Sequence, residues 1–562
     1  MRLHLRELLT RAIEKTAKGE GLSMADLPPL ILEAPKQAEF GDLATNFAML
    51  WARSAKKSPR LIAEAILKNL EDHDGILARG EIAGPGFLNF AFAPAFYYRQ
   101  LRELVQGQQP EPDLGRGQRI QVEFASVNPT GPLHVGHGRV AVIGDVLARL
   151  HEATGFNVAR EYYVNDAGRQ MENLGISLDI RYRELFGEKV EFPQDGYPGD
   201  YLKDIASKIK AERGDALLHL PRETAVDFFR MQSGETLLNS IREQLRRFGI
   251  EFDSFFSEKE MRERHAVEET IQILRGRGLI YSNDGAEWFK SSQFGDDKDR
   301  ALIKSDGELT YFAGDIAYHR NKLQRGFQKL IDVWGADHHG YVPRLKAAIQ
   351  GLGYDPGMLQ VVLVQMVQLT RGGEPVRMGK RTGEFVSLDE VLQEVGRDAA
   401  RFFFLMRKSD SHLDFDLELA KKESSENPVF YVQYAHARIA SIFEQAERNG
   451  VVWNPSTVAS ARLERLDLSE ELDLIRNTIR YNDVLEESTR ELEPHRMIFY
   501  LLDLAGAFHR YYNRHRVITD DTDLTHARLL LVEQIQKTVR RGLGVIGVDA
   551  PFKMASRTES VN

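Results

Sequence analysis

Two histidines three residues apart, His134 and His137, stand where a strand, a turn and a helix are expected to follow one another. Apolar and polar side chains alternate over residues 120–124, which indicates a strand, and apolar residues recur at helical spacing after the histidines. The start of a helix carries unpaired N–H groups and a partial positive charge, so it suits a phosphate. Gly136 and Gly138 leave room for a ligand against the backbone. This stretch therefore predicts a nucleotide site.

Neither of the two commonest phosphate-binding motifs accounts for this stretch. It has no G-x-G-x-x-G, and the chain has no G-x-x-x-x-G-K-[ST]; the segment GGEPVRMGKR at 372–381 has a different glycine spacing and ends in Arg381. The run NPTGPLHVGHGR at 128–139 instead resembles the bacterial type of arginyl-tRNA synthetase. In that resemblance HVGH corresponds to the HIGH motif of class I aminoacyl-tRNA synthetases.

The composition excludes several classes of protein. The 562 residues include no cysteine, so neither a disulfide nor a thiolate metal site can form. The sequence has no apolar run of membrane-spanning length, and its charged N-terminus does not resemble a signal peptide, so a cytoplasmic protein without a membrane partner is expected. A net charge of −9 argues against indiscriminate binding to nucleic acid, although a basic patch on one face could still bind RNA.

The order of the expected elements predicts three domains. Residues 1–110 are expected to form an N-terminal α+β domain, which the resemblance implies to be an additional tRNA-binding domain. Residues 117–397 are expected to form an α/β catalytic domain with a Rossmann-like parallel sheet and a mostly helical insertion at about 170–260. Residues 398–562 begin with Asp-Ala-Ala-Arg, which resembles the DALR sequence of an all-α anticodon-binding domain, and helices are expected almost throughout.

Several elements are expected at particular places. In the N-terminal domain, a helix is expected to open within residues 40–51 with Asp42 as its cap, and strands are expected within residues 82–92 around a Gly-Pro-Gly turn. In the catalytic domain, the alternation of short strands and helices predicts helices on both faces of a parallel sheet. The expected strands there include residues 161–166, 287–289, 310–312, 329–334 and 360–367, and the expected helices include 265–275, 316–324 and 342–352.

Three clusters of polar residues follow expected strands: Glu258 in FDSFFSE, Tyr311 and Asp315 in TYFAGDIAYHR, and His338 in WGADHHGY. Taken alone, Asp315 could simply cap a helix that begins at the next residue. The adjacent histidines of the third cluster lack the usual spacing of zinc ligands, so no metal site is predicted.

The resemblance implies a role for each cluster. A guanidinium presents a planar fork of donors, which carboxylates and carbonyl oxygens accept well. The residues implied to hold L-arginine are Asn128, Glu258, Tyr311 and Asp315. The residues implied to bind ATP around the first nucleotide motif are Gly136, Gly138, Gly335 and His338.

A basic, glycine-rich loop, VRMGKRTGE at 376–384, follows an expected strand. Alone it could be a solvated turn, but beside a phosphate site it could close on a triphosphate. It resembles the KMSKS loop, with Arg377 in place of the first lysine and Gly379 in place of the first serine. The resemblance implies that Lys380 binds the β- and γ-phosphates, that Met378 also contacts ATP, and that Mg²⁺ helps to screen the charge. The implied catalytic residues are therefore His134, His137 and Lys380.

Two stretches of the C-terminal domain combine cations with aromatic residues. YVQYAHAR places Tyr434 and Arg438 on one face of a helix, and HRYYNRHR does the same for Arg510 and Arg514. Cations can contact phosphates and aromatic rings can stack on unpaired bases, although a surface helix with buried tyrosines would have the same pattern. The family places its tRNA anticodon contacts in this domain, which favours RNA.

The resemblance spans the chain and implies an arginine–tRNA ligase. Such an enzyme joins arginine to AMP from ATP and then transfers the arginyl group to the 3′-terminal ribose of tRNA(Arg). Two alternatives remain: another enzyme with a HIGH motif, and a tRNA-binding protein that has lost catalysis. The presence of His134, His137 and Lys380 argues against the second. A monomer is expected, because the family is usually monomeric.

Overall fold

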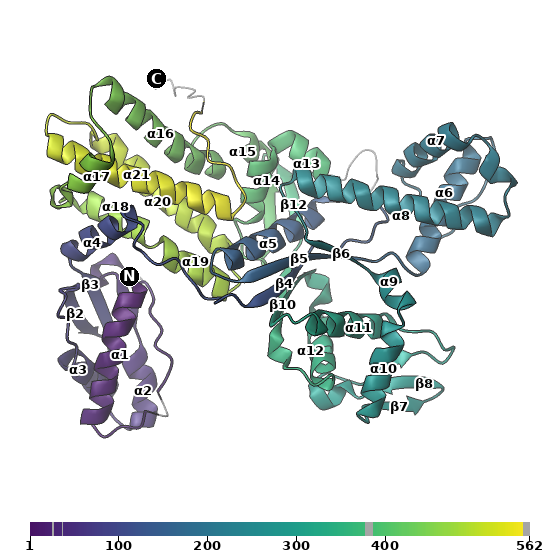
Figure 1. The fold of residues 1–562 in the computed structure, drawn as a ribbon, viewed down its shortest axis with the longest axis horizontal. Helices are drawn as coiled ribbons and strands as arrows, with labels where there is room; N and C mark the ends of the chain where they lie inside the picture. Colours follow the sequence, from purple (N-terminus) through teal and green to yellow (C-terminus); the bar gives the residue numbers. More distant parts are fainter. Residues whose placement is uncertain (25–26, 36, 377–385, 555–562) are drawn as a thin grey trace.

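The computed structural model describes residues 1–24, 27–35, 37–376 and 386–554 of the chain. Figure 1 shows four bodies around a central sheet: the N-terminal body at the lower left, the C-terminal helices above it, a helical arm at the upper right, and a small α/β body at the lower right. Within the described ranges, none of the helices combines the length and apolar character needed to cross a bilayer.

The N-terminal body is a three-stranded antiparallel sheet covered by helices. Its strand order is β1-β3-β2, and a tight turn joins β2 to β3, as the Gly-Pro-Gly sequence predicted. The expected Asp42 cap is wrong, because residues 43–45 pair with β3 as a strand and the helix starts only after Asn46. Asp42 instead accepts hydrogen bonds from Phe92 N at 2.8 Å and from Arg476 Nη1 of the C-terminal helices at 3.0 Å. The elements are α1 (Arg2–Gly19), β1 (Leu43–Thr45), α2 (Phe47–Ala55), α3 (Pro59–Lys68), β2 (Leu77–Ala83), β3 (Phe87–Phe92) and α4 (Pro94–Val105).

The central sheet has five parallel strands in the order β11-β10-β4-β5-β6, so the predicted α/β fold class is confirmed. Ile120 and Val122 of β4 are fully buried, as expected for a strand covered by helices on both faces. Helix α5 follows β4 directly and begins at the predicted residue, Val135. The elements are β4 (Arg119–Glu123), α5 (Val135–Glu152), β5 (Asn157–Val164), β6 (Ser254–Ser257), β10 (Lys329–Gly335), α12 (Val342–Gly351) and β11 (Leu359–Val364).

Two expectations for this region are wrong. Residues 310–312 do not form a strand, because Thr310 caps helix α11 and its hydroxyl accepts a hydrogen bond from Ala313 N at 3.3 Å. Asp315 therefore lies inside α11 and caps nothing. The apolar run 360–367 is not one strand: β11 ends at Val364, and the chain then enters a second sheet of order β13-β12-β14. The elements are α11 (Tyr311–Gln324), β12 (Val367–Arg371), β13 (Glu374–Pro375) and β14 (Leu413–Asp416).

The segment between β5 and β6 is helical, as predicted, and forms the arm in Figure 1. It has its own apolar core, which includes Leu174, Leu178 and Phe229. The lower-right body packs a small antiparallel sheet and two helices against α11. The arm contains α6 (Arg169–Glu184), α7 (Tyr201–Arg213) and α8 (Arg222–Arg247), and the small body contains α9 (Glu258–Glu263), α10 (Ala266–Gly276), β7 (Ile280–Asn283), β8 (Ala286–Phe289) and β9 (Arg300–Ile303).

The C-terminal region is a helical bundle that packs on the N-terminal body and on α5. Strand β14 is an exception to the expected run of helices, and it pairs with β12 in parallel register. The helices are α13 (Leu388–Val395), α14 (Arg397–Phe404), α15 (Leu417–Lys421), α16 (Pro428–Arg448), α17 (Pro455–Ser460), α18 (Ser469–Ile479), α19 (Tyr481–Arg490), α20 (His495–Arg514) and α21 (Thr522–Val545).

Candidate active site

The two histidines of HVGH form the N-terminal cap of α5. Nδ1 of His134 accepts hydrogen bonds from Gly136 N at 3.1 Å and His137 N at 3.4 Å, and Nδ1 of His137 accepts one from His134 N at 3.3 Å. The two rings stack with their centroids 3.4 Å apart. Because both Nδ1 atoms accept, each neutral ring carries its hydrogen on Nε2. The cap therefore fixes the tautomer of both imidazoles.

The electrostatics of this cap favour neutral rings. Burial lowers the pKa of His134, and burial together with the neighbouring His134 lowers the pKa of His137 to about 3. Both side chains are therefore uncharged near neutral pH. Each can act toward a phosphate as a neutral Nε2–H donor, while the N-terminus of α5 supplies partial positive charge.

The segment that follows the basic loop lies against this cap. Leu388 N donates to Leu133 O at 2.8 Å, and Val135 N donates to Val386 O at 3.2 Å. On the other side of the loop, Val376 N donates to Leu369 O at 2.9 Å. The loop residues between these anchors, which include the predicted Met378 and Lys380, lie outside the described residues. Their anchors nevertheless bring the segment after the loop directly to the start of α5.

A cavity of about 350 Å³ opens beyond the carboxyl ends of β4, β5 and β10. Such ends are where open parallel sheets bind ligands. The cavity brings together three of the predicted residues, namely Tyr311, Asp315 and His338. Its other walls are mainly acidic or aromatic. They are formed by Glu123, Ser126, Tyr163, Tyr318, His319, Asp332, Trp334, Tyr341 and Leu345.

The Asp315 carboxylate is the central polar group of this cavity. Tyr341 OH donates to its Oδ2. Burial raises the pKa of Asp315 to about 6, and the nearby Glu258 and Glu123 also raise it, whereas the Tyr341 hydrogen bond and His319 oppose the rise. Tyr311 is 68% exposed and stands at the mouth of the cavity. The cavity therefore offers a desolvated acceptor to a cation that enters past Tyr311.

Glu258 and Asn128 do not line this cavity. Glu258 is buried behind it, where its Oε1 accepts from Arg262 Nη2 at 2.6 Å and its carboxylate also accepts a hydrogen bond from Tyr163, a cavity wall. Asn128 Nδ2 donates instead to Gln170 Oε1 of the arm at 2.7 Å. The structure thus places Glu258 one side chain away from the cavity and connects Asn128 to the arm.

Sequence reasoning missed several walls of the cavity. Glu123 and Tyr163 lie near the carboxyl ends of two adjacent strands, and this position in the sequence could have identified both as residues of the cavity. Tyr341 lies within the predicted WGADHHGY cluster, but its contact with Asp315 joins residues 26 positions apart. Only the packing of α11 against the 336–341 turn brings these two side chains together.

The predicted glycines differ in their surroundings. A Cβ at Gly136 would lie 3.0 Å from the His134 ring, so this glycine allows the cap to form. A Cβ at Gly138 would lie 2.6 Å from Leu388 Cδ1 and 3.2 Å from the Phe404 ring. Gly138 thus serves the packing of α5 against α13 and α14. Gly335 ends β10, directly before the turn that carries His338.

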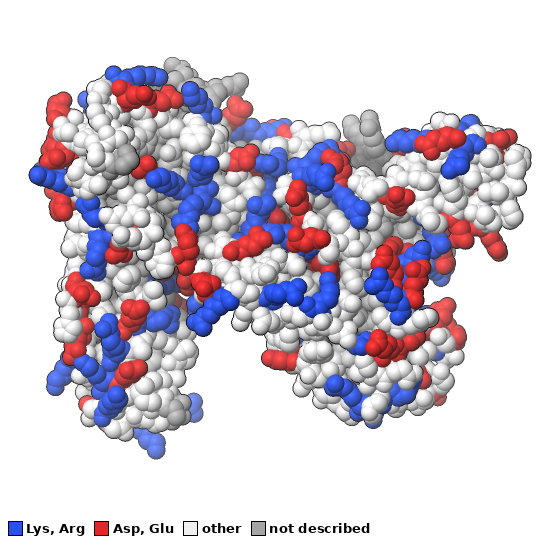
Figure 2. All heavy atoms as spheres, viewed as in Figure 1, with Lys and Arg blue, Asp and Glu red and all other residues white. Residues whose placement is uncertain are grey.

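The predicted C-terminal patch is partly assembled. Arg438 Nη2 donates to Tyr434 OH at 3.2 Å, which confirms that the two share a helix face, and its guanidinium lies 5.1 Å from the centre of the Tyr512 ring. Arg514 forms an ion pair with Glu470 at 3.5 Å. Arg510 lies on the same helix, α20. Figure 2 shows Lys and Arg interleaved with Asp and Glu over this view of the molecule, so charge alone marks no RNA site there.

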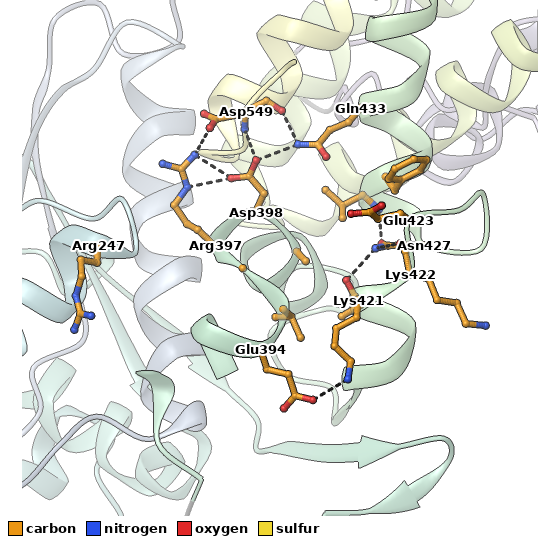
Figure 3. A pocket seen from close by; sticks show the side chains of 16 residues that line it. Arg247, Glu394, Arg397, Asp398, Lys421, Lys422, Glu423, Asn427, Gln433 and Asp549 are labelled. Carbon is orange, nitrogen blue, oxygen red and sulfur yellow. Dashed lines mark hydrogen bonds and ion pairs between the residues drawn. The ribbon is translucent and has the colours of Figure 1, made fainter. Parts of the chain in front are cut away.

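A larger hollow of about 840 Å³ lies between α13, α14, α15 and α16 (Figure 3). Arg397 in its wall pairs with Asp398 at 2.9 Å and Asp549 at 2.6 Å, and Lys421 pairs with Glu394 at 3.0 Å. These cations are already neutralised by neighbouring carboxylates. The smaller cavity beside Asp315, at the strand ends, is therefore the better candidate for chemistry.

Family models match nearly the whole chain. Residues 100–436 match the class I (R) tRNA synthetase catalytic domain, residues 3–92 match the arginyl-tRNA synthetase N-terminal domain, and residues 432–554 match the DALR anticodon-binding domain.

Individual proteins are similar over the same length. The arginine–tRNA ligase of Syntrophotalea carbinolica is 49% identical over 560 residues, covering 99% of this chain and 100% of that protein. The arginine–tRNA ligase of Desulfosudis oleivorans is 50% identical over 552 residues, covering 98% and 99%. The solved arginyl-tRNA synthetase of Thermus thermophilus shares the fold, with a TM-score of 0.77 at 22% identity, over 98% of this chain and 100% of that one.

Proposed function

The chain belongs to the arginyl-tRNA synthetase family, and we propose that the cavity around Asp315 is the place where it holds arginine. As a class I arginine–tRNA ligase, it converts arginine and ATP to arginyl-adenylate and pyrophosphate, and then transfers the arginyl group to tRNA. The observation that carries the assignment is the desolvated carboxylate of Asp315 in an aromatic-walled cavity at the strand ends.

The cavity walls suit a guanidinium. Asp315 offers carboxylate oxygens to a planar fork of N–H donors, and the rings of Trp334 and Tyr341 offer flat surfaces for it. Each charge-assisted hydrogen bond contributes roughly 1.5–3 kcal/mol. In our proposal Tyr311 closes the mouth, Glu258 acts through Tyr163, and Asn128 turns toward arginine from its present contact with the arm.

Such a cavity needs no editing site against lysine. Lysine has a single ammonium group, so it would leave part of the buried acceptor set unpaired. A site built around buried hydrogen bonds rejects analogues that lack the matching group by roughly 10⁴–10⁵.

The histidine cap supports ATP binding beside the arginine cavity. In our proposal the Nε2–H groups of His134 and His137 donate to phosphate oxygens, Gly136 lies under the adenine, and Gly335 and His338 line the adenosine. The arginine carboxylate attacks the α-phosphorus in line, and pyrophosphate leaves. Because charge builds on phosphate oxygens during this step, oriented N–H donors stabilise it without a protein nucleophile.

Lys380 and Met378 complete the proposed ATP site from the loop whose following segment contacts the start of α5. Mg²⁺ would bind together with the triphosphate, since the described residues contain no group of three or more His, Asp or Glu arranged to hold a metal ion. Bound in this way, Mg²⁺ would screen phosphate charge. Gly138, by contrast, is better explained by packing.

The remaining proposals concern the whole chain. Tyr434, Arg438, Arg510 and Arg514 are proposed to contact the tRNA anticodon arm, because cations and aromatic rings lie together on α16 and α20. We propose domain boundaries at residues 1–110, 117–397 and 398–562, a monomer, and a cytoplasmic location.

ATP–pyrophosphate exchange, measured with each amino acid and with or without total tRNA, tests the proposal. We expect exchange with arginine only, and only when tRNA is present. Exchange with a different amino acid would contradict the arginine cavity, and a complete lack of exchange with retained tRNA binding would identify a catalytically inactive tRNA-binding protein.

A further inference from the structure

His319, on the face of α11 that covers the sheet, has an acceptor oxygen at each ring nitrogen. Nδ1 lies 2.8 Å from the backbone oxygen of Asp315, and Nε2 lies 2.8 Å from Oδ2 of Asp332. The His319 side chain is only 5% exposed. A neutral imidazole has one N–H and one lone pair, so it would direct that lone pair at one of the two oxygens. Only a ring with a hydrogen on both nitrogens, an imidazolium, would donate to both oxygens.

A second buried histidine provides an internal comparison. His151 on α5 also places Nδ1 against the backbone oxygen four residues earlier, at 2.7 Å from Leu147 O. Its Nε2, however, has no hydrogen-bond partner within the part of the chain that the structure describes. Burial lowers the pKa of His151 to about 4, so this ring is neutral. The two sites differ by the carboxylate that faces Nε2 of His319.

His319 contacts a buried network of charged groups. Asp332 also accepts from Lys322 Nζ at 2.9 Å, and Lys322 Nζ donates to Glu123 Oε2 at 2.5 Å. Asp332 and Glu123 lie side by side on β10 and β4. Burial raises the pKa of Glu123, and the Lys322 ammonium opposes that rise. With both carboxylates ionised, the two carboxylates, one ammonium and one imidazolium sum to zero charge, and loss of the His319 proton would leave a net negative charge near Asp315.

We propose that His319 is a positioning residue for the arginine site: its imidazolium holds the backbone of Asp315 and keeps the Asp315 carboxylate ionised. The inference rests on the proposed role of Asp315 as the guanidinium acceptor. A nearby cation favours the charged form of a carboxylate. The other groups that act on Asp315 are Tyr341 from the 336–341 turn, Glu258 from α9 and Glu123 from β4. Those that face His319 are Asp332 from β10, Glu123 from β4, and Tyr318 and Lys322 from α11.

His319→Gln tests this role, because the glutamine amide can still donate to Asp332 but carries no charge. KM and kcat for arginine would be measured in aminoacylation between about pH 5.5 and 8.5. In the wild type, arginine binding weakens at low pH as Asp315 takes up a proton. In the variant the midpoint of this loss should move up by about one pH unit. KM near pH 6 should then rise up to about tenfold, whereas kcat and the KM near pH 8 should stay close to wild type.

His151→Gln is the matched control, since it replaces a buried helical histidine with the same backbone contact but no carboxylate partner. Its pH midpoint should equal that of the wild type. The proposal would be overturned in favour of a purely structural role if His319→Gln left the pH midpoint of arginine binding unshifted. It would also be overturned if the variant raised KM for arginine equally at every pH.

A second measurement covers the case in which His319→Gln fails to fold. Nitrogen-15 spectra of the full-length wild type with labelled histidine should contain an imidazolium resonance that persists to about pH 8. This resonance should be missing from His319→Asn, which keeps a donor toward Asp315 O. The proposal would be overturned if the wild-type spectra showed only neutral histidine rings. If Asp315→Asn kept a wild-type KM for arginine, the proposed role of Asp315 would fail instead. The nitrogen-15 spectra would still decide whether the His319 ring is protonated.

Discussion

In the proposed arginine site the Asp315 carboxyl is largely desolvated at the cavity wall, and it must be charged to accept a guanidinium. Burial raises its pKa to about 6, and the hydrogen bond from Tyr341 limits that rise. The carboxyl is therefore mostly ionised near neutral pH, while it remains poorly hydrated. A desolvated charge of this kind interacts with a cation more strongly than a surface carboxylate does, because less water has to be displaced.

The raised pKa of Asp315 predicts an acidic limit for arginine binding. The guanidinium stays charged at all relevant pH values, so only the carboxyl titrates in this range. The binding-competent ionised form dominates above about pH 6 and is lost as the pH falls below it. KM for arginine should accordingly rise by up to about tenfold for each pH unit below that value. A KM that stays flat down to about pH 5 would contradict this prediction.

Asp315→Ala should remove arginine activation and leave the fold intact. The variant loses at least one charge-assisted contact pair, worth about 3 kcal/mol, which corresponds to more than a hundredfold in exchange rate at limiting arginine. ATP–pyrophosphate exchange measures the loss, and circular dichroism checks the fold. Asp204→Ala on the exposed face of α7 is the matched control and should retain wild-type exchange. Wild-type activation in Asp315→Ala would remove the proposed arginine site.

At the scale of elements, the position of helix α5 and its histidine cap on the sheet depends on the close contact between Gly144 and Phe124. A Cβ on Gly144 would lie 2.2 Å from Cγ and 2.3 Å from Cβ of Phe124, which follows strand β4. The Phe124 Cβ is fixed by its own backbone, so the ring cannot turn away from this clash. Gly144 thus allows α5 to lie directly against the end of β4, and this contact sets where the cap stands above the sheet.

Gly144→Ala should therefore destabilise the protein although alanine favours helices. Overpacking costs about 1–3 kcal/mol, and here it should exceed the helix gain of about 1 kcal/mol. Calorimetry should show a lower Tm for Gly144→Ala. Gly544→Ala in α21 is the matched control, because nothing lies within 4 Å of the position where its Cβ would stand. Equal Tm values for the two variants would contradict the role of the close approach.

The elements around α5 could be predicted from sequence because local periodicity determines them. The strand before the turn, the turn itself and the helix after it agree with the pattern over residues 119–152. The strand expected at 310–312 failed because its β-favouring residues stand at a helix start, where the Thr310 hydroxyl caps α11. The walls contributed by Tyr163 and Tyr341 could not be predicted, because only packing between distant segments brings them to Asp315.

At the scale of the molecule, two buried guanidinium groups link α5 to the rest of the chain. Arg139 on α5 donates to Gln365 O and Ser411 O at 2.8 Å and to Lys408 O at 3.0 Å. These carbonyls belong to the connections around β12 and β14. The helix that carries the histidine cap is thus tied to the sheet that precedes the basic loop.

The second guanidinium, Arg401 of the Asp-Ala-Ala-Arg sequence, joins three bodies at one point. It donates to Asp145 on α5, to Phe248 O after the arm at 3.1 Å, and to Ile546 O after α21 at 3.0 Å. The Arg401 side chain is completely buried. Helix α5, the arm and the C-terminal helices therefore share one buried hydrogen-bond centre.

Arg401→Gln should destabilise the whole assembly. It leaves two backbone carbonyls with fewer donors and removes one partner of a buried ion pair, a loss that typically costs about 3–5 kcal/mol. Asp145 keeps Arg149 as a partner at 2.8 Å, so the loss should lie toward the lower end of that range. Calorimetry should show a lower Tm, and limited proteolysis should release the C-terminal helices at temperatures at which the wild type resists.

Two comparisons decide whether Arg401 acts through these contacts. Arg407→Gln changes an exposed arginine just after the same helix and should leave Tm unchanged. Asp145→Asn combined with Arg401→Gln should cost less than the sum of the two single changes, because both break the same ion pair. Additive losses would mean that the two residues stabilise the chain independently. In that case the buried centre would not explain how the helix with the histidine cap is held against the C-terminal helices.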